Sequence, residues 1–482
     1  MSLLLSRPSD SVIPHRPPFL RFLRLRTTIA AIAILCATDL SPAAAQATRA
    51  ERVSVMDSIA ESGVKEGRIA GIAVAVVQGN DTLLMKGYGK ADLAWDIPMP
   101  ADAVFEIGSV TKQFTAAAVL QLRDEGKIDL DADITTYLPD YPTQGHRIPV
   151  RRLLDHTSGI KGYTEMRAFG EIVTRDLPRD SLVARFAAEP FDFPPGEALI
   201  YNNSAYFLLG LIIEKASGMT YEDYVEQHLF ARLGMRSSSY CSNSEVVPKR
   251  ARGYQLTPRG LVRAPYLDHT WPYAAGSLCS TIGDMTMWLK ALHGGKVLPA
   301  ASYQEMITPG RLTDGTPVRY AMGLTRTPDA RGRNAIHHGG GIFGFLSDTR
   351  YYPDADLYVV VLVNTTGNLS PSAIANELVD VLLPAAPDEP RPFAGDVAQL
   401  VGTYSGAARG GPMTFTVTAA ENGLMARVND GSPMPLAWRE GLTFTAGGRL
   451  VIFQRDGDSG PASVVRLDSG GGHFVLRRTA GQ

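Results

Sequence analysis

The sequence predicts an α/β (α+β) fold with one antiparallel sheet flanked by helices, a mainly helical lobe, and a small all-β domain at the C-terminus. Three observations support this fold class. Strand patterns occur near residue 71 and again between residues 336 and 363, and the long segment between them has a mainly helical pattern. Strands that are distant in sequence can pair in one sheet, so the helical segment becomes an inserted lobe. Residues 393–482 alternate short strands with Gly and Asn turns, which is typical of an all-β domain.

The elements of the main domain follow from their periodicity. Residues 51–67 have the spacing of a helix, and residues 71–93 have the pattern of two strands joined by a turn at Gly79. The remaining expected elements are mainly helices over residues 105–296, strands at residues 336–338, 346–352 and 358–363, and a helix over residues 374–383.

The first 45 residues have the pattern of a secretory signal. Arginines at positions 21, 24 and 26 precede an apolar run that begins at Ile29, and small residues at 42–45 offer a cleavable site. The run is about ten residues long, whereas about 20 are needed to cross a bilayer as a helix. We therefore expect a secreted or periplasmic protein without a stable membrane span after cleavage. An uncleaved anchor is the alternative.

The predicted domain boundaries follow from composition. Residues 1–45 form the signal and residues 46–385 the main domain. Residues 386–392 form a linker, because the prolines at 387, 390 and 392 prevent a continuous helix there. Residues 393–482 form the β-rich domain.

The net charge of the chain is too small to attract a charged partner such as nucleic acid. The formal net charge is −2, from 47 basic and 49 acidic residues spread along the chain, so no basic stripe for nucleic acid is present. Only Cys241 and Cys279 remain after signal removal. An oxidising compartment permits them to pair, and two separate thiols are equally consistent with the sequence.

Ser109 and Lys112 form the first candidate for chemistry. Ser109 follows Gly108 at the start of a predicted helix, where serine is a favoured N-cap and a nearby lysine is common. Residues three apart share one helix face, so Lys112 can also reach the Ser109 hydroxyl. A desolvated lysine has a lowered pKa and can accept the hydroxyl proton. The motif alone does not decide between the two readings.

A second candidate lies at Tyr201 and Asn203, where a Pro-Pro-Gly turn leads into a predicted helix. Asn203 or Ser204 can cap that helix, and Tyr201 can rest on the core as a loop aromatic. In a functional interpretation, a tyrosine beside a lysine is held as phenolate and relays protons, and Asn203 holds a substrate carbonyl.

A third candidate is the glycine-rich strand that contains His338 and Gly340. Such strands mark the close approach of another backbone, which can belong to a ligand. Neighbouring residues of a strand point to opposite faces, so His337 and His338 are not expected to share a metal.

Taken in order, Ser109-x-x-Lys112, Tyr201-x-Asn203 and His338-x-Gly340 resemble the three motifs of the serine β-lactamase and penicillin-binding superfamily. The resemblance is closest to the class C β-lactamase group, which includes D-alanyl-D-alanine carboxypeptidases and family VIII esterases. It covers residues 50–385, including the segment LLDHTSGI at 153–160.

The resemblance implies an exported serine hydrolase of β-lactamase-like fold, with the site between the sheet and the helical lobe. Ser109 would attack a carbonyl carbon while Lys112 and Tyr201 share the base and acid work. Water would release the acyl group, with no metal or organic cofactor required. The substrate would be a small molecule or peptide, bound by Asn203, His338 and Gly340, with its oxyanion on the backbone N–H groups of Ser109 and Gly341. His156 is assigned no chemistry.

One departure from the family pattern bears on the substrate. Class C β-lactamases usually carry Lys-Thr-Gly where this chain has His338-Gly339-Gly340, so the lysine and threonine that help hold a substrate carboxylate are missing. We therefore expect cleavage of an amide, peptide or ester. The alternatives are a penicillin-binding or sensor-like protein that acylates with little turnover, or a true β-lactamase. The β-rich tail is an open question, and docking on protein or cell-wall partners is one hypothesis for it.

Overall fold

The computed structural model describes residues 48–329, 331–383, 385, 392–421, 423–457, 459–469 and 471–479. The predicted signal at residues 1–45 and residues 386–391 of the predicted linker (386–392) lie outside the described residues, so the domain boundaries stay predictions. Within the described part of the chain, no helix is long and apolar enough to cross a membrane.

The main sheet has seven strands in the order β10-β11-β12-β13-β1-β2-β3. Strand β1 (Gly71–Gln78) pairs antiparallel with β13 (Leu357–Val363), so the two ends of the main domain meet in the middle of the sheet. This confirms the predicted antiparallel sheet assembled from distant segments. The other strands are β2 (Asp81–Asp92), β3 (Ile97–Pro98), β10 (Thr325–Pro328), β11 (Asn334–Ile342) and β12 (Phe345–Tyr352).

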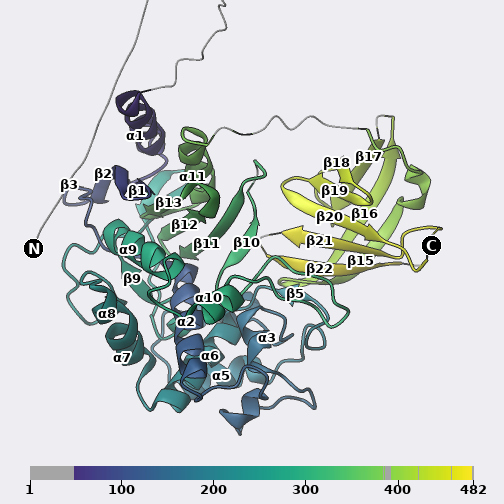
Figure 1. The fold of residues 1–482 in the computed structure, drawn as a ribbon, viewed down its shortest axis with the longest axis horizontal. Coiled ribbons are helices and arrows are strands. Elements are labelled where there is room, and N and C mark those ends of the chain that lie inside the picture. The colour runs from purple at the N-terminus through teal and green to yellow at the C-terminus, as the bar shows by residue number, and fades with distance from the viewer. Residues whose placement is uncertain are drawn as a thin grey trace, which may run out of the picture. The chain divides into compact units, whose positions relative to one another are not determined.

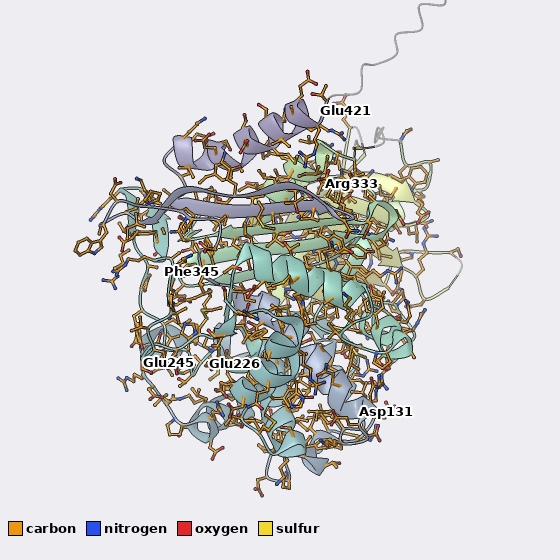
Figure 2. All side chains as sticks on the ribbon, turned by 60° about the vertical axis from the view of Figure 1, so that its left-hand side comes forward. Asp131, Glu226, Glu245, Arg333, Phe345 and Glu421 are labelled. Atoms are coloured by element: carbon orange, nitrogen blue, oxygen red, sulfur yellow. A yellow bond between two sulfur atoms is a disulfide. The ribbon has the colours of Figure 1, made fainter. Side chains whose placement is uncertain are left out.

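Helices cover both faces of this sheet because its central strands are apolar on both sides. On β1, Ile72 and Val74 pack against α1 (Arg49–Lys65) and α11 (Pro371–Asp380), while Ala73 belongs to the core on the other face. Figure 1 shows α1 and α11 on one side of the sheet and α9 (Ile282–His293) on the other, and Figure 2 shows side chains filling both spaces.

Helix α11 begins three residues before its predicted start. The Ser370 hydroxyl accepts a hydrogen bond from the Ala373 N–H, and Pro371 occupies the first helical position. Both are helix-start signals, since a serine cap satisfies an otherwise unpaired N–H and proline lacks one.

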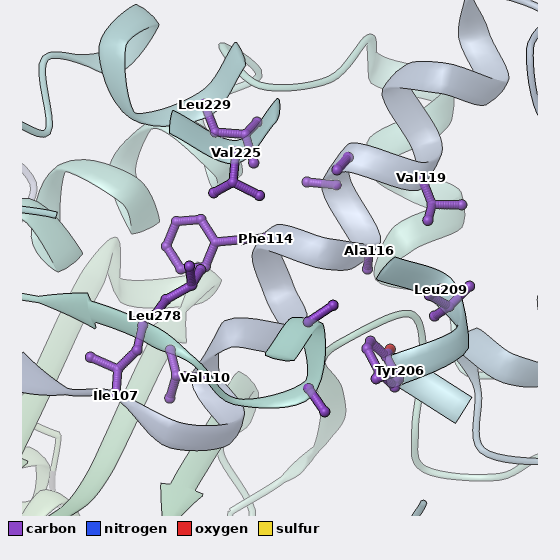
Figure 3. Packing of buried hydrophobic residues seen from close by; sticks show 14 of the residues in the cluster. Ile107, Val110, Phe114, Ala116, Val119, Tyr206, Leu209, Val225, Leu229 and Leu278 are labelled. Carbon is purple, nitrogen blue, oxygen red and sulfur yellow. The ribbon is translucent and has the colours of Figure 1, made fainter. Parts of the chain in front are cut away.

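The helical lobe is built around α2 (Thr111–Asp124), in which every residue from Thr111 to Leu120 is buried. Phe114 stacks on Trp288 with ring centroids 3.9 Å apart, and Figure 3 shows its ring pointing toward Val225 and Leu229. A helix packed on all sides cannot shift easily, so α2 is a rigid base for any side chain that it carries. Helices α6 (Asn203–Ser217), α7 (Tyr221–Val225), α10 (Ala300–Met306) and a π-helical turn (Glu226–Phe230) contact it. The other helices of the lobe are α3 (Val150–Leu154), α4 (Phe169–Ile172), α5 (Arg179–Ala187) and α8 (Ala231–Leu233).

The C-terminal domain is all-β, as predicted, and the structure shows that it is a barrel. Eight consecutive strands, β15 to β22, pair in sequence order, and β15 also pairs with β22 to close the sheet. Their bounds are β15 (Gly402–Ala408), β16 (Gly411–Ala420), β17 (Gly423–Val428), β18 (Met434–Glu440), β19 (Thr443–Ala446), β20 (Arg449–Gln454), β21 (Val464–Ser469) and β22 (Gly472–Arg478).

The barrel sheet continues into the helical lobe. Strand β22 pairs with the short strand β5 (Leu199–Ile200), with Gly472 opposite Ile200. The next residue, Tyr201, donates its backbone N–H to the Gly471 carbonyl at 3.1 Å. Backbone pairing of this kind is directional, so it fixes the barrel against the residues that lead into α6.

Cys241 and Cys279 form a disulfide with their Cα atoms 5.2 Å apart, which settles the question that the sequence left open. Cys279 lies in β9 (Leu278–Ser280), which pairs with β4 (Phe105–Glu106) just before Ser109. The remaining strands are β6 (Ser239–Tyr240), which also pairs with β9, and the small sheet of β7 (Tyr254–Thr257), β8 (Gly260–Arg263) and β14 (Thr365–Thr366).

Candidate active site

Ser109 lies inside a 3₁₀ turn (Gly108–Val110) that leads directly into α2. Its hydroxyl is 3.1 Å from Lys112 Nζ, and Ile107, not Ser109, occupies the cap position before the turn. Gly108 has a φ of 52°, and a Cβ on it would lie 3.0 Å from the backbone of Gly341. Only glycine allows both this conformation and this close approach.

Lys112 is fully buried, and its ammonium or amine nitrogen has three polar neighbours. Nζ lies 2.7 Å from the Ala275 carbonyl oxygen, 2.8 Å from Asn203 Oδ1 and 3.1 Å from Ser109 Oγ. Burial is the largest cause that holds the Lys112 pKa well below its ordinary value of 10.5. The amine is therefore the form that this environment favours.

The three neighbours of Lys112 also decide where the lone pair of that amine points. A neutral amine has two N–H hydrogens and one lone pair. The Ala275 carbonyl and Asn203 Oδ1 can only accept hydrogen bonds, so they take the two hydrogens. In the amine form the lone pair then faces Ser109 Oγ at 3.1 Å, and the Ser109 hydroxyl can donate to it. This is the geometry of a general base on a serine nucleophile.

Tyr201 places its ring 4.9 Å from Lys112 Nζ. Its buried hydroxyl makes no hydrogen bond of normal geometry with a described residue, although interaction with the Ser109 hydroxyl lowers the Tyr201 pKa. The Tyr201 hydroxyl is therefore close enough to Ser109 to affect the Tyr201 pKa, but the two hydroxyl groups do not form a hydrogen bond of normal geometry. Burial is the larger effect and raises the Tyr201 pKa well above 10, so Tyr201 is a neutral phenol and not the phenolate that the sequence suggested.

The two adjacent asparagines have different partners. Asn202 is the N-cap of α6: its Oδ1 accepts from the Ala205 N–H at 2.9 Å, and its backbone N–H donates to His156 Nδ1 at 3.1 Å. Neither Asn203 nor Ser204 is the cap. Capping by Asn202 leaves the Asn203 amide free to accept from Lys112, and its Nδ2 donates to Thr164 Oγ1 at 3.1 Å.

His156 is buried beside these residues. Its ring centroid lies 4.3 Å from that of Tyr201 and 4.4 Å from that of Tyr320. Burial holds the His156 pKa well below 6.5, so the ring is neutral. It packs against Tyr201 and accepts from the Asn202 backbone N–H.

His338 is also buried and neutral. Its Nδ1 donates to the Gly339 carbonyl, which can only accept, so Nε2 accepts from the Tyr320 hydroxyl at 2.8 Å. Burial lowers the His338 pKa to about 3. A direct contact between this ring and the substrate stays a prediction, and it would require the bond to Tyr320 to break.

Gly340 and Gly341 bring β11 against the turn that carries Ser109. A Cβ on Gly340 would overlap the Ile107 carbonyl oxygen and the Ser347 hydroxyl, so a side chain does not fit there. The Ser347 hydroxyl donates to the Ile107 carbonyl at 2.8 Å and ties the two segments together. The backbones of Ser109 and Gly341 thus lie side by side, as an oxyanion site made from their N–H groups requires.

A cavity of about 340 Å³ opens in front of Ser109, with Asn203 and Gly341 also in its wall. Most of the remaining wall is apolar, which favours an apolar group on the substrate. The apolar wall consists of Tyr163, Phe169, Leu267, Pro272, Ala275, Ile342, Phe343 and Leu346.

Three residues near Lys112 were not predicted from the sequence. Thr164 and Glu165 lie on a 3₁₀ turn (Tyr163–Glu165), and Arg409 follows strand β15 of the barrel. Arg409 Nε donates to Glu165 Oε1 at 2.6 Å, and its guanidinium lies 5.2 Å from the Tyr201 ring centroid. Thr164 and Glu165 come shortly after the segment 153–160 that resembles the family, which was the only available signal. For Arg409 the sequence offers none.

Comparison with known proteins identifies the family. Residues 56–383 match the family described as Beta-lactamase. The putative penicillin-binding protein PbpX of Bacillus subtilis (strain 168) is 30% identical over 320 residues, which cover 66% of this chain and 76% of that protein. A D-aminopeptidase of Gluconobacter oxydans (strain 621H) is 26% identical over 338 residues, which cover 69% of this chain and 62% of that protein.

A solved structure gives the same result. The D-amino acid amidase of Ochrobactrum anthropi SV3, complexed with L-phenylalanine amide, has a TM-score of 0.60 and 25% sequence identity. That match covers 69% of this chain and 98% of the amidase. The predicted membership of the serine β-lactamase and penicillin-binding superfamily is confirmed, while placement in the class C group stays a prediction. The chain belongs to the Beta-lactamase family and is a serine hydrolase of the β-lactamase fold.

Proposed function

We propose that the protein cleaves an amide, peptide or ester bond through an acyl-enzyme on Ser109. The observation that carries this proposal is the buried Lys112 nitrogen, which lies 3.1 Å from the Ser109 hydroxyl and has the acceptors Ala275 O and Asn203 Oδ1 as its other two neighbours.

The reaction begins when Lys112 takes the Ser109 proton and Ser109 Oγ attacks the carbonyl carbon. The oxyanion that forms accepts from the backbone N–H groups of Ser109 and Gly341. Tyr201, a neutral phenol, gives its proton to the leaving nitrogen or oxygen and recovers one from the Lys112 ammonium. Water then attacks the acyl carbon, and the same groups return Ser109 to its hydroxyl form.

The cavity supports a substrate with an apolar acyl group. Its wall near Ser109 carries aromatic and aliphatic side chains, including Phe169 and Phe343. Relatives named D-aminopeptidase and D-amino acid amidase support an amide or short peptide of an apolar D-amino acid. The missing Lys-Thr pair at His338-Gly339 supports the same class over a β-lactam, because neither a fixed cation nor a hydroxyl is offered there.

We also propose that the protein is exported to the periplasm or beyond. The signal pattern of residues 1–45 supports export, and the Cys241–Cys279 disulfide is of the kind that persists in oxidising compartments. Fractionation of cells that express the full chain tests this, since mature protein retained in the cytoplasm would contradict it.

A second candidate function is a penicillin-binding protein that acylates with little turnover. It is favoured by the relative named putative penicillin-binding protein PbpX at 30% identity. This candidate shares the acylation step with the first and differs only in the rate of deacylation. Stoichiometric labelling by a fluorescent penicillin without turnover of any ester or amide would favour it.

The test compares wild type with Ser109→Ala on three substrates: a p-nitrophenyl ester, a D-phenylalanine amide and a chromogenic cephalosporin. We expect the ester and the amide to be cleaved by wild type only, with an acyl adduct on Ser109 visible by mass spectrometry at early times. Full activity of Ser109→Ala on a cleaved substrate would show that the nucleophile is assigned wrongly.

A further inference from the structure

A chain of hydrogen bonds runs from Lys112 toward the barrel. Lys112 Nζ donates to Asn203 Oδ1 at 2.8 Å, and Asn203 Nδ2 donates to Thr164 Oγ1 at 3.1 Å. The Thr164 hydroxyl lies 2.9 Å from both carboxylate oxygens of Glu165. Arg409 Nε then donates to Glu165 Oε1 at 2.6 Å. Five side chains therefore connect the C-terminal barrel to the neighbour of the nucleophile.

The direction of every bond in this chain is set at its Glu165 end. An ionised carboxylate only accepts, so the Thr164 hydroxyl must donate to it and can only accept from Asn203. The Asn203 NH₂ group is thereby turned toward Thr164, and its oxygen toward Lys112. The Lys112 N–H directed at that oxygen leaves the lone pair for Ser109. A protonated or missing carboxylate would remove this constraint.

Arg409 is placed to hold the carboxylate in position. It lies at the turn between β15 and β16, and its side chain is 37% exposed while that of Glu165 is 13% exposed. The pairing of β22 with β5, next to Tyr201, fixes the barrel at this place. A charge-assisted bond to a largely buried carboxylate is among the stronger side-chain hydrogen bonds.

We propose that the barrel is a working part of the active site and that Arg409 is a positioning residue for Lys112. Through Glu165, Thr164 and Asn203 it fixes the hydrogen bonding that points the Lys112 lone pair at Ser109. This inference rests on the proposed function, in which Lys112 is the general base. It assigns the barrel a role in the chemistry, and the docking role considered from the sequence stays a separate hypothesis.

The charges around Lys112 give the inference a measurable sign. After burial, the Arg409 cation lowers the Lys112 pKa and the Glu165 anion raises it. Loss of Arg409 removes the lowering charge and leaves the raising one unpaired, so the Lys112 pKa should rise. The other titratable groups near Lys112 are neutral: His156 and His338 have lowered pKa values, and Tyr201 and Tyr206 have raised ones.

The experiment measures kcat/KM of the full-length protein against pH for wild type and four variants. Arg409→Ala should lower kcat/KM about tenfold and move its acid limb up by about one pH unit, because the base is protonated at a higher pH. Arg409→Lys should restore part of both effects. Glu165→Gln should lower kcat and move the acid limb down. Arg427→Ala, which removes an exposed arginine of β17 in the same barrel, is the matched control and should change neither quantity.

Thermal unfolding of each variant separates loss of position from loss of fold. The inference is overturned if Arg409→Ala has the melting temperature of wild type and the acid limb of its kcat/KM profile is unchanged. So does a rise in KM confined to substrates with a free carboxylate, because Arg409 would then be a substrate contact. Nitrogen-15 NMR of the Lys112 side chain reads the same pKa change without turnover.

Failure of the inference differs from failure of the proposed function. If wild type is not acylated on Ser109 by any of the three substrates, the proposed function fails, and the NMR titration still decides whether Arg409 acts on Lys112. If acylation depends on Ser109 and the Arg409→Ala and Arg427→Ala profiles coincide, the inference alone fails.

Discussion

Lys112 and Arg409 are basic side chains of one site, and the molecule holds them in opposite ways. Lys112 stands on the fully packed helix α2, its nitrogen has only uncharged partners, and burial keeps its pKa well below 10.5. Arg409 stands on a turn of the barrel, is partly exposed, and is paired with the Glu165 carboxylate. Burial without a counter-charge favours the neutral amine of Lys112, whereas the Glu165 carboxylate holds the Arg409 guanidinium in position near the surface.

The largest expected effect on kcat/KM comes from placing an arginine, the residue type of the exposed position 409, at the buried position 112. Lys112→Arg puts a group that stays protonated where a neutral amine is needed, so kcat/KM should fall by about 10³-fold or more. Lys112→Met is the matched variant, since it keeps most of the side-chain volume and lacks both charge and base. Steady-state kinetics on the ester checks both variants. Substantial activity in folded Lys112→Met would contradict the assignment of the base.

The second effect is on stability, and it concerns the disulfide near the segment that contacts Lys112. The Cys241–Cys279 disulfide closes a loop of 38 residues and fixes β9 close to Ala275, which accepts from Lys112. Replacing both cysteines with alanine should lower the free energy of unfolding by about 4 kcal/mol through the loop entropy of the unfolded chain. Denaturant unfolding with and without reductant measures this. If wild type loses no stability on reduction, the disulfide does not support the fold.

The third effect separates two neighbouring asparagines. Asn203→Ala removes an acceptor of Lys112 and breaks the chain to Glu165, so kcat/KM should fall by about 30- to 100-fold with little change in melting temperature. Asn202→Ala removes the cap of α6 and should cost about 1 to 2 kcal/mol of stability while kcat/KM stays within a few-fold. Kinetics and melting of both variants check the pair. An exchange of the two patterns would show that the roles are reversed.

Much of the fold and the centre of the site could be predicted because the signals are local. The continuous apolar runs of β1 and β13 indicate buried strands, and the i, i+3 spacing of Ser109 and Lys112 is set by helix geometry. Which asparagine caps α6 was not decided by residue type, because Asn202, Asn203 and Ser204 are all good caps. The Ala275 carbonyl that accepts from Lys112 is a backbone group, so the residue type at position 275 gives no indication of its role.

Arg409 could not be predicted for a different reason. It reaches Glu165, 244 positions earlier in the chain, because β22 pairs with β5 and places the turn after β15 beside the helical lobe. In the sequence, Arg409 looks like any solvent-exposed arginine in a turn between two strands. Docking between distant segments is a tertiary result, and here it determines a part of the site.

The smallest expected effect is the salt dependence of wild-type kcat/KM, which tests the partly exposed Arg409. Ionic strength screens charges that water can reach and leaves buried groups nearly untouched, and at 1 M salt the screening length is about 3 Å. The Arg409–Glu165 pair should therefore weaken by a few tenths of a kcal/mol between 0.05 M and 1 M salt. Wild-type kcat/KM on an uncharged ester should fall by less than about threefold over this range, with its acid limb moving up slightly. The same titration of Arg409→Ala should show no fall in kcat/KM and no upward move of the acid limb, because the pair that salt weakens is absent and screening of the remaining Glu165 charge can only lower the Lys112 pKa. An equal salt response in both proteins would mean that the sensitivity arises elsewhere and that Arg409 does not act through its charge.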